Sequence, residues 1–590
     1  MASLRAAENA AQLAVALVLI SVPLWAGDYN ASQIGLFLLY GMATQSVAFC
    51  WGRVGFLPLG QALFFGIGAY ASALILKGTQ FMSPSIVYLC LSLAILLPAF
   101  FAYVIAIVIF SRRIDSGPYF SLITLALCML AFLLVNRWAD VTGGFNGLTG
   151  VPDLPGTDRY GSLYYVIATL SVCVTAIFSW LARRPIGVLW SAVSQNEERL
   201  QFFGFATHKL KAVAFATAGG VAGLGGALYA PHEGMVSPQA IGIVLSTQFI
   251  IWAAVGGKSG PLGAQLGAVI VGLVASVLRD VFAYWEVFVA IGFIVIVRLF
   301  PDGLAGACKQ LLKVIGIRHT PTSLACAELA PRVRRQTLEE KEKLLVFEDV
   351  RAEQGGVKIL NGLNLDISER GVTCLIGPNG AGKTSSFNAM TGRLEVKAGR
   401  ICFMGMVISK MAAWEVARLG VGRKFQIPTV FSSLSVGENL LIAQWANRIR
   451  PLGMVSRKPL RWTTSGLQRM LHRFPSLATS VADPACTLAQ GNRQMLEFAM
   501  VAISEPRLML LDEPCAGLSA DETHQMMDAI TCAVSELQAS SVVIEHDMSA
   551  LERIADHVVV LHQGRRLAAG SLSFIRSSDE VRQVYAGGRK

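Results

Sequence analysis

The first half of the sequence is a series of long apolar runs, and these runs constrain the fold more than any other feature. Most of them are close to the ~20 residues that an α-helix needs to cross the hydrocarbon core of a bilayer. From about residue 340 onward the composition is that of a soluble α/β protein. The ten candidate spans are 10–27, 32–51, 54–76, 85–111, 117–136, 161–182, 212–230, 240–257, 261–278 and 283–300. The sequence therefore predicts a multi-domain chain, with an all-α polytopic membrane domain followed by a soluble α/β domain.

The positions of basic residues predict the direction of the spans. Most Lys and Arg residues between spans fall on one side, which the positive-inside rule makes cytoplasmic. The basic residues on that side are Arg5, Arg53, Arg112, Arg113, Arg183, Arg184, Arg199, Lys209, Lys211, Lys258 and Arg298. The net charge of +11 has the same origin, and no basic patch with interleaved aromatics indicates a nucleic-acid partner. We expect both termini and the soluble half in the cytosol, and membrane lipid as a partner.

One cytoplasmic loop, residues 183–211, is longer than the others. We expect an amphipathic docking helix over Val188–Phe203. Its charged residues Glu197, Glu198 and Arg199 would be exposed. Leu200, Phe202 and Phe203 would be available for packing against an energy-using domain; the alternative is a solvated loop.

The soluble half contains a phosphate-binding loop. The apolar run Val372–Ile376 predicts a buried strand, and Ser385–Thr391 predicts the start of a helix. Between them a sequence fits G-x-x-x-x-G-K-[ST], which places backbone N–H groups around phosphate oxygens. These nucleotide-site residues are Gly377, Pro378, Asn379, Gly380, Ala381, Gly382, Lys383, Thr384 and Ser385. Lys383 would reach the β- and γ-phosphates of ATP, and the Thr384 hydroxyl would hold Mg²⁺.

Two further strand ends and one loop carry polar residues that suit nucleotide hydrolysis. The run Leu508–Leu511 ends at Asp512, a second Mg²⁺ contact, and Glu513 is placed to polarise an attacking water. The run that begins at Val542 ends at His546, which would sense the γ-phosphate, and Gln426 lies in a loop that would bridge Mg²⁺ and the membrane half. A second helix-opening loop, made of Leu488, Ala489, Gln490, Gly491 and Asn492, would bind a nucleotide held by another subunit.

At this point the soluble half resembles the nucleotide-binding domain of ABC transporters over essentially all of 345–590. Gly377–Thr384 looks like the Walker A motif, Gln426 like the Q-loop, Leu488–Gln494 like the signature loop and Leu508–Glu513 like Walker B. Ala516–Ser519 looks like the D-loop and His546 like the H-loop. The chain departs from the family at Gln354, where an aromatic residue usually stacks on adenine. It departs again at Asn492-Arg493-Gln494, so we hypothesise that its signature loop serves the weaker of two ATP sites.

The membrane half resembles permeases of branched-chain amino acid importers. The residues that carry this resemblance are Gly60–Tyr70, Gly117–Phe120, Thr142–Pro152 and Pro301–Leu304. The segment Gly422–Phe431 looks closer to the urea/amide branch of the same superfamily. The resemblance implies a permease (1–305), a linker (306–343) and an ABC-type ATP-binding domain (344–590), fused in one importer subunit.

The implied function is ATP-driven uptake of a small solute, with branched-chain amino acids first and urea or short amides second. The implied partners are a second permease subunit, a second ATP-binding subunit and a periplasmic or lipid-anchored substrate-binding protein, at the bacterial inner membrane. An exporter half-transporter and a non-transport membrane ATPase remain as alternatives. The ten-span count disfavours the exporter, which would usually have six.

Overall fold

The computed structural model describes residues 4–79, 82–111, 116–258, 260–281, 284–300, 302–314, 328–333 and 343–586. The chain divides into two compact units. Unit 1 comprises residues 1–194 and 208–320, and unit 2 comprises residues 195–207 and 321–590. A short segment between two membrane helices therefore belongs to the unit that contains the soluble half. Part of the expected linker 306–343, together with Arg112, Arg113 and Pro301, lies outside the described residues.

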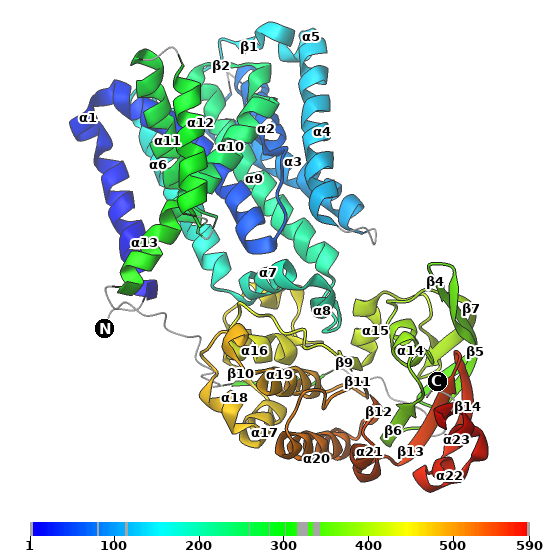
Figure 1. Ribbon diagram of the computed structural model, residues 1–590. Coiled ribbons are helices and arrows are strands. Elements are labelled where there is room, and N and C mark those ends of the chain that lie inside the picture. The colour runs from blue at the N-terminus through cyan, green and yellow to red at the C-terminus, as the bar shows by residue number, and fades with distance from the viewer. Residues whose placement is uncertain are drawn as a thin grey trace. The chain divides into compact units, whose positions relative to one another are not determined.

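Unit 1 is a helical bundle in which long apolar helices lie side by side (Figure 1). Its longer helices are α1 (Leu4–Phe49), α2 (Gln61–Gly78), α3 (Pro84–Phe110), α4 (Ser116–Arg137), α6 (Ser162–Ala182), α9 (Thr207–Glu233), α10 (Ile243–Gly256), α11 (Pro261–Val281) and α12 (Trp285–Leu299). Shorter elements are a π-helical turn (Cys50–Val54), α5 (Ala139–Thr142), α7 (Pro185–Gln195), α13 (Gly303–Val314) and the antiparallel pair β1 (Leu148–Thr149) and β2 (Met235–Val236).

The helices correspond to the expected spans. α1 has a non-helical residue at Gly27, where φ is 77°, so it consists of two arms that account for the first two spans. Each of the other eight spans overlaps one helix, from α2 to α12. Seven helices of the described residues are long and apolar enough to cross a membrane, and α10 is a shorter apolar helix. The sequence prediction of a polytopic helical membrane domain is confirmed.

Glycines let α9 approach its neighbours closely. A Cβ at Gly226 would lie 1.8 Å from the carbonyl oxygen of Phe65 on α2, and one at Gly68 would lie 2.2 Å from that of Gly223. Small residues allow such backbone contact between membrane helices. Larger side chains at these positions would push α9 and α2 apart.

Unit 2 has a six-stranded sheet in the order β14-β13-β6-β12-β11-β9, in which only β14 is antiparallel to its neighbour. Its strands are β6 (Gly371–Ile376), β9 (Val421–Lys424), β11 (Leu508–Asp512), β12 (Ser540–Ile544), β13 (His557–His562) and β14 (Arg565–Gly570). The helices of unit 2 are α8 (Glu197–Gln201), α14 (Lys383–Met390), α15 (Ala413–Leu419), α16 (Val436–Trp445), α17 (Ser465–Arg473), α18 (Pro475–Thr479), α19 (Gln490–Ile503), α20 (Ala520–Leu537), α21 (Met548–Ile554), α22 (Leu572–Ser577) and α23 (Asp579–Ala586). β11 and β12 are buried at every position, which explains their continuous apolar sequences.

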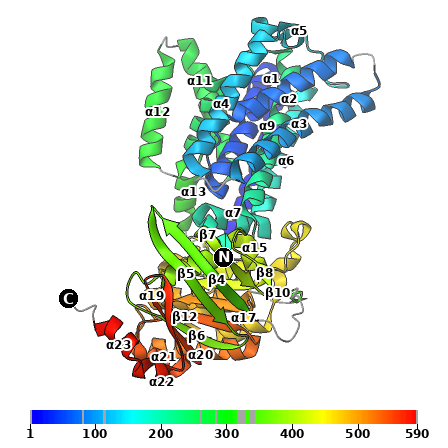
Figure 2. The same cartoon turned by 90° about the vertical axis from the view of Figure 1, so that its right-hand side faces the viewer.

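A second, antiparallel sheet packs with the first through a shared apolar core. Its order is β5-β4-β7-β8, and Figure 2 shows β4, β5 and β7 as long twisted strands. The strands are β4 (Leu345–Gln354), β5 (Val357–Ile367), β7 (Val396–Phe403) and β8 (Met406–Val407), with a separate parallel pair β3 (Glu328–Leu329) and β10 (Trp462–Thr463). The strands expected at 372–376, 508–511 and from Val542 are all present.

The expected docking helix differs from the structure in two respects. It is interrupted at Asn196, which ends α7 and begins α8, and the Asn196 side chain accepts a hydrogen bond from the Arg199 backbone N–H at 2.8 Å. Arg199, which the sequence placed on the exposed face, is only 1% exposed. Leu200, Phe202 and Phe203 are buried as expected.

Candidate functional site

The central strands of unit 2 bring four expected site segments to one edge of the sheet. β6, β12, β11 and β9 are consecutive parallel neighbours, with Leu375 opposite Ile544 and Ile544 opposite Asp512. The phosphate loop, His546, Glu513 and Gln426 follow these strands within one or two residues. Because parallel strands end at the same edge, the register alone places these four segments next to one another.

The phosphate loop has the backbone that its glycines allow. Gly380 and Gly382 have φ values of 78° and 98°, which residues with a side chain rarely adopt. A Cβ at Gly377 would lie 2.2 Å from the carbonyl oxygen of Leu561. The loop leads into α14 at Lys383, and a helix start with free N–H groups favours anions.

Lys383 is buried in its own loop. Its ammonium donates hydrogen bonds to the carbonyl oxygens of Gly377 at 2.7 Å and Pro378 at 3.1 Å. Burial lowers the pKa of Lys383 below its ordinary value, while Glu513 and Asp512 act in the opposite direction. Lys383 is thus a buried cation at the start of the helix, and a bound anion would stabilise its charge.

Asp512 lies beside the end of the phosphate loop. Its carboxylate accepts a hydrogen bond from Thr384, and burial raises the pKa of this carboxyl above its ordinary value. The Asp512 Oδ1 atom is buried without a hydrogen-bond partner, which is costly for a carboxylate. A hydroxyl and an unpartnered carboxylate oxygen suit a small hard cation such as Mg²⁺, which takes oxygen ligands. Of the three expected Mg²⁺ ligands, Thr384 and Asp512 are therefore adjacent.

Glu513 is held by two of the other expected residues. Its Oε2 accepts a hydrogen bond from the Gln426 amide at 3.0 Å, and its Oε1 lies 3.3 Å from Nε2 of His546. The Gln426 side chain thus contacts Glu513 rather than Asp512. Glu513 also has a φ of 43°, an uncommon conformation for a residue with a side chain. Such backbone strain occurs preferentially at functional positions.

Glu545, next to His546, was not singled out from the sequence. Burial raises its pKa to about 7, with a further contribution from the charge of Glu513. Its side chain hydrogen bonds with Cys515. Glu545 comes directly after β12 and is followed by His546, and this position gives no sequence signal for a buried carboxyl. The burial of Glu545 can be recognised only when the packing around it is known.

The expected signature loop does not join the phosphate loop. Leu488 and Ala489 precede α19, which begins at Gln490, so the expected helix start is present. A Cβ at Gly491 would lie 2.5 Å from Glu522 Oε1, and Asn492 accepts a hydrogen bond from Ser476 at 2.9 Å. Within the described part of the chain, no hydrogen bond or ion pair connects these residues to Gly377–Ser385.

A buried network of charged residues, which the sequence did not predict, links the segment 195–207 to the rest of unit 2. Arg199 donates a hydrogen bond to the Arg423 carbonyl oxygen at 2.6 Å and pairs with Glu497 on α19 at 3.3 Å. The Arg423 guanidinium in turn donates to Thr391 and Asn388, each at 2.7 Å, at the end of α14. Burial lowers the pKa of Arg199, and the Glu497 charge opposes this change.

Comparisons with known proteins agree with both halves. Residues 31–298 match the family model described as the branched-chain amino acid transport system permease component, and residues 360–516 match the ABC transporter model. The chain is similar to the branched-chain amino acid transport ATP-binding protein BraF of Pseudomonas aeruginosa, with 37% identity over 40% of this chain and 93% of the relative. It is also similar to LivG of Salmonella typhimurium, with 33% identity over 42% of this chain and 98% of the relative. The chain is also similar to a solved nucleotide-free ATP-binding cassette from an ABC transporter, with 25% identity and a TM-score of 0.36. This match covers 41% of this chain and 99% of the solved chain.

Proposed function

Because the chain belongs to the ABC transporter family for branched-chain amino acids, as a permease fused to an ATP-binding domain, we propose that it imports these amino acids. It is a membrane protein with an ATPase domain that couples ATP hydrolysis to transport. We place it in the bacterial inner membrane with its ATPase half in the cytosol. Its proposed domains are the permease (1–305), linker (306–343) and ATP-binding domain (344–590).

The contact of Glu513 with both Gln426 and His546 is the observation that carries the proposed chemistry. Glu513 would accept a proton from the water that attacks the γ-phosphate. His546 would orient the Glu513 carboxylate during this step, and Gln426 holds the carboxylate before nucleotide binds. When phosphate enters, Lys383 would exchange its two carbonyl partners for phosphate oxygens. The loop from Gly377 to Ser385 would cradle the phosphates with its backbone N–H groups.

The expected Mg²⁺ fits Thr384 and Asp512, since the Asp512 Oδ1 atom has no other partner. Gln426 would complete the set by leaving Glu513 in the nucleotide-bound state. When bound, the cation neutralises charge on the phosphates. Thr384 and Asp512 hold their positions through their mutual hydrogen bond before any ligand arrives.

We propose that the signature loop, Leu488–Asn492, acts on the nucleotide of a second ATP-binding subunit. Its separation from the phosphate loop within this chain supports that arrangement. A second permease subunit and a periplasmic or lipid-anchored substrate-binding protein would complete the importer. The segment 195–207 would transmit movement, because its Arg199 is tied to Arg423 and Glu497 of the ATPase half.

Uptake by reconstituted proteoliposomes tests this proposal. The full chain, its partner subunits and the binding protein would be supplied with ATP and radiolabelled leucine, with urea and acetamide in parallel. We expect leucine uptake that needs both ATP and the binding protein, and that is lost in Glu513→Gln. Uptake of urea or acetamide but not leucine would overturn the substrate assignment. ATP-dependent export, or ATP hydrolysis without any transport, would overturn the assignment of the protein as an importer.

A further inference from the structure

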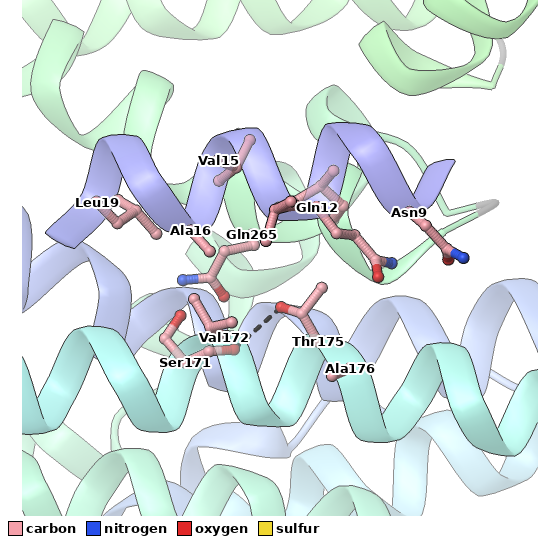
Figure 3. Close-up of a pocket in the computed structure, with 12 residues that line it drawn as sticks. Asn9, Gln12, Val15, Ala16, Leu19, Ser171, Val172, Thr175, Ala176 and Gln265 are labelled. Carbon is pink, nitrogen blue, oxygen red and sulfur yellow. Dashed lines mark hydrogen bonds between the residues drawn. The ribbon is translucent and has the colours of Figure 1, made fainter. Parts of the chain in front are cut away.

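The cavity of unit 1 is lined by amide side chains that are already bonded within the protein. Figure 3 shows Gln12 and Gln265 in this cavity of about 240 Å³ between α1, α6 and α11. The Gln12 amide donates a hydrogen bond to Ser179 Oγ at 2.7 Å, and Gln265 accepts one from Gln45, also at 2.7 Å. The described residues that line the cavity carry no charged side chain. The lining therefore offers no charge to a ligand, whereas one segment of unit 2 offers several.

The segment between α16 and α17 is basic and has no acidic residue of its own. No Asp or Glu occurs between Glu438 and Asp483. Residues 450–461, which we call the basic segment, contain four exposed cations: Arg450, Arg457, Lys458 and Arg461. Within the described part of the chain, the side chains of these four residues form no ion pair and no hydrogen bond. Their charges therefore face solvent without a partner.

Acidic residues of other elements pair with cations that flank the basic segment instead. Glu505 lies 2.9 Å from Arg448, whose side chain is buried. Glu536 lies 2.8 Å from Arg469 on α17. Because these carboxylates already hold their own partners, they do not neutralise the basic segment.

The basic segment is held at both ends and exposes an apolar side chain between them. Trp445, which is fully buried, donates a hydrogen bond from Nε1 to the Pro459 carbonyl oxygen at 2.9 Å. The Asn447 amide donates to the Ala417 carbonyl oxygen at 3.3 Å. Two 3-10 turns, Pro451–Met454 and Lys458–Arg461, shape the segment, and Leu452 in the first turn is 90% exposed. An apolar residue is thus presented among unpaired cations.

The start of this segment lies against the part of unit 2 that continues into a membrane helix. A Cβ at Gly204 would lie 2.8 Å from Asn447 Oδ1, and the Gly204 carbonyl oxygen accepts a hydrogen bond from Arg418 at 2.8 Å. Gly204 precedes α9 by three residues, and α9 is long and apolar enough to cross a membrane. Three residues span at most about 11 Å, so the chain itself keeps Asn447 close to the start of α9.

Charge and hydropathy together select the partner. Anionic headgroups attract clusters of Lys and Arg near a bilayer surface. An apolar side chain beside such a cluster adds binding by entering the boundary between headgroups and acyl chains. Leu452 and the four cations provide both contributions, and the tie to α9 keeps them within reach of the bilayer.

We propose that the basic segment, residues 450–461, binds anionic phospholipids of the leaflet that faces the ATPase half. Arg450, Arg457, Lys458 and Arg461 contact the headgroups, and Leu452 enters the headgroup boundary. This surface goes beyond the proposed import, because it binds neither nucleotide nor transported solute. It gives the ATPase half a contact with the membrane in addition to its covalent link.

Photo-cross-linking of the full chain in lipid nanodiscs tests this surface. p-Benzoylphenylalanine in place of Leu452 should form adducts with phosphatidylglycerol in nanodiscs made of equal parts phosphatidylcholine and phosphatidylglycerol, and few adducts in phosphatidylcholine alone. Higher salt should lower the yield, because it screens exposed charges. The same photoreactive residue in place of Phe574, which is 56% exposed on α22, is the control position and should give few lipid adducts.

Charge variants identify the cations as the cause. The combined change Arg457→Gln, Lys458→Gln and Arg461→Gln should lower the adduct yield about tenfold or more, since each basic side chain near an anionic surface contributes roughly fivefold. These side chains are exposed and unpaired, so the fold should be retained. The combined change Arg351→Gln, Lys397→Gln and Arg400→Gln removes the same net charge from exposed positions of β4 and β7 and should leave the yield unchanged.

The proposal would be wrong if position 452 formed no lipid adducts in the anionic nanodiscs. It would also be wrong if phosphatidylcholine alone gave the same yield, or if the first triple variant cross-linked as the wild type does. Cross-links to a protein or to co-purified nucleic acid in place of lipid would assign the basic segment to that other partner. The assay needs neither ATP nor a transported solute, so its outcome is separate from the outcome of the uptake experiment.

Discussion

Replacement of Arg199 by Met is the most informative perturbation of the segment 195–207. Met keeps an unbranched apolar side chain but removes the charge, so Glu497 stays buried beside an uncharged neighbour. Both members of this pair have fully buried side chains. Arg199→Met also removes the hydrogen bond to the Arg423 carbonyl oxygen. We therefore expect the segment to detach from the ATPase half more readily, with no change in the nucleotide site itself.

The contacts that Glu497 keeps determine how much Arg199→Met should destabilise the segment. Removing one partner of a buried ion pair typically costs about 3–5 kcal/mol, because the other charge stays buried. Glu497 keeps hydrogen bonds from the Phe425 backbone N–H at 3.3 Å and from Thr429 at 3.0 Å. Lys424 also lies within electrostatic range of Glu497. Since these groups still stabilise the carboxylate, we expect a loss of about 2–3 kcal/mol in the free energy of local opening.

Hydrogen–deuterium exchange of the full chain in nanodiscs measures this loss at the segment itself. A loss of about 2–3 kcal/mol corresponds to roughly 30- to 150-fold faster exchange in peptides that cover 195–207. Arg393→Met is the matched control, because Arg393 pairs with Glu198 of the same segment at 2.7 Å but both side chains are close to half exposed. An exposed pair is worth about 0–1 kcal/mol.

A charge-neutral double variant separates the ion pair from general packing damage. Arg199→Met combined with Glu497→Gln should restore part of the lost protection, because no unpaired charge remains. The reasoning would be refuted by exchange in Arg199→Met no faster than in Arg393→Met. It would also be refuted if the double variant exchanged as fast as the sum of the single effects predicts.

Three further predictions concern the nucleotide site. Glu513→Gln should lower steady-state ATP hydrolysis by about 100-fold or more while filter-binding assays still find bound ATP, and undiminished hydrolysis would exclude Glu513 as the base. Gly491→Asp would place a carboxylate against Glu522 and should reduce ATP turnover of the assembled transporter only in part; a loss as complete as in Lys383→Ala would contradict the weaker-site hypothesis. Because burial raises the pKa of Glu545 to about 7, the folded state binds a proton that the unfolded state lacks between about pH 4.5 and 7, so the protein loses stability as pH rises through that window. Glu545→Gln should therefore have the same melting temperature as the wild type near pH 5 and a higher one at pH 8. An equal difference in melting temperature at both pH values would refute Glu545 as the cause of the pH dependence.

Much of unit 2 could be predicted because its signals are local. The apolar runs before the phosphate loop and before Asp512 have strand length, and both are buried strands in the structure. Parallel strands then bring their loops together without any further information. The positions of Glu513 and His546 beside one another follow from this register. The expected signature loop could likewise be placed at a helix start, since glycine and short polar residues precede an apolar run.

The break at Asn196 had a usable local signal that the amphipathic pattern obscured. Asn is a preferred helix N-cap, and Glu197 and Glu198 follow it as acidic residues of a first turn. The hydrophobic pattern continues through this position because both α7 and α8 bury apolar side chains. Periodicity alone therefore predicts one helix where capping chemistry predicts two.

The burial of Arg199 had no local signal at all. Arginine in a polar loop is exposed by default, and its burial depends on a partner distant in sequence. That partner, Glu497, also fixes the Phe425 backbone and Thr429 around the Gln426 loop. Arg423 completes the connection, since its carbonyl oxygen holds Arg199 while its guanidinium holds the end of α14. A shift of α14 on phosphate binding would break these hydrogen bonds inside the core unless Arg423 and the segment 195–207 moved with it. The cost of leaving buried polar groups unpaired therefore makes this network a physical means of linking nucleotide binding to the segment between α7 and α9.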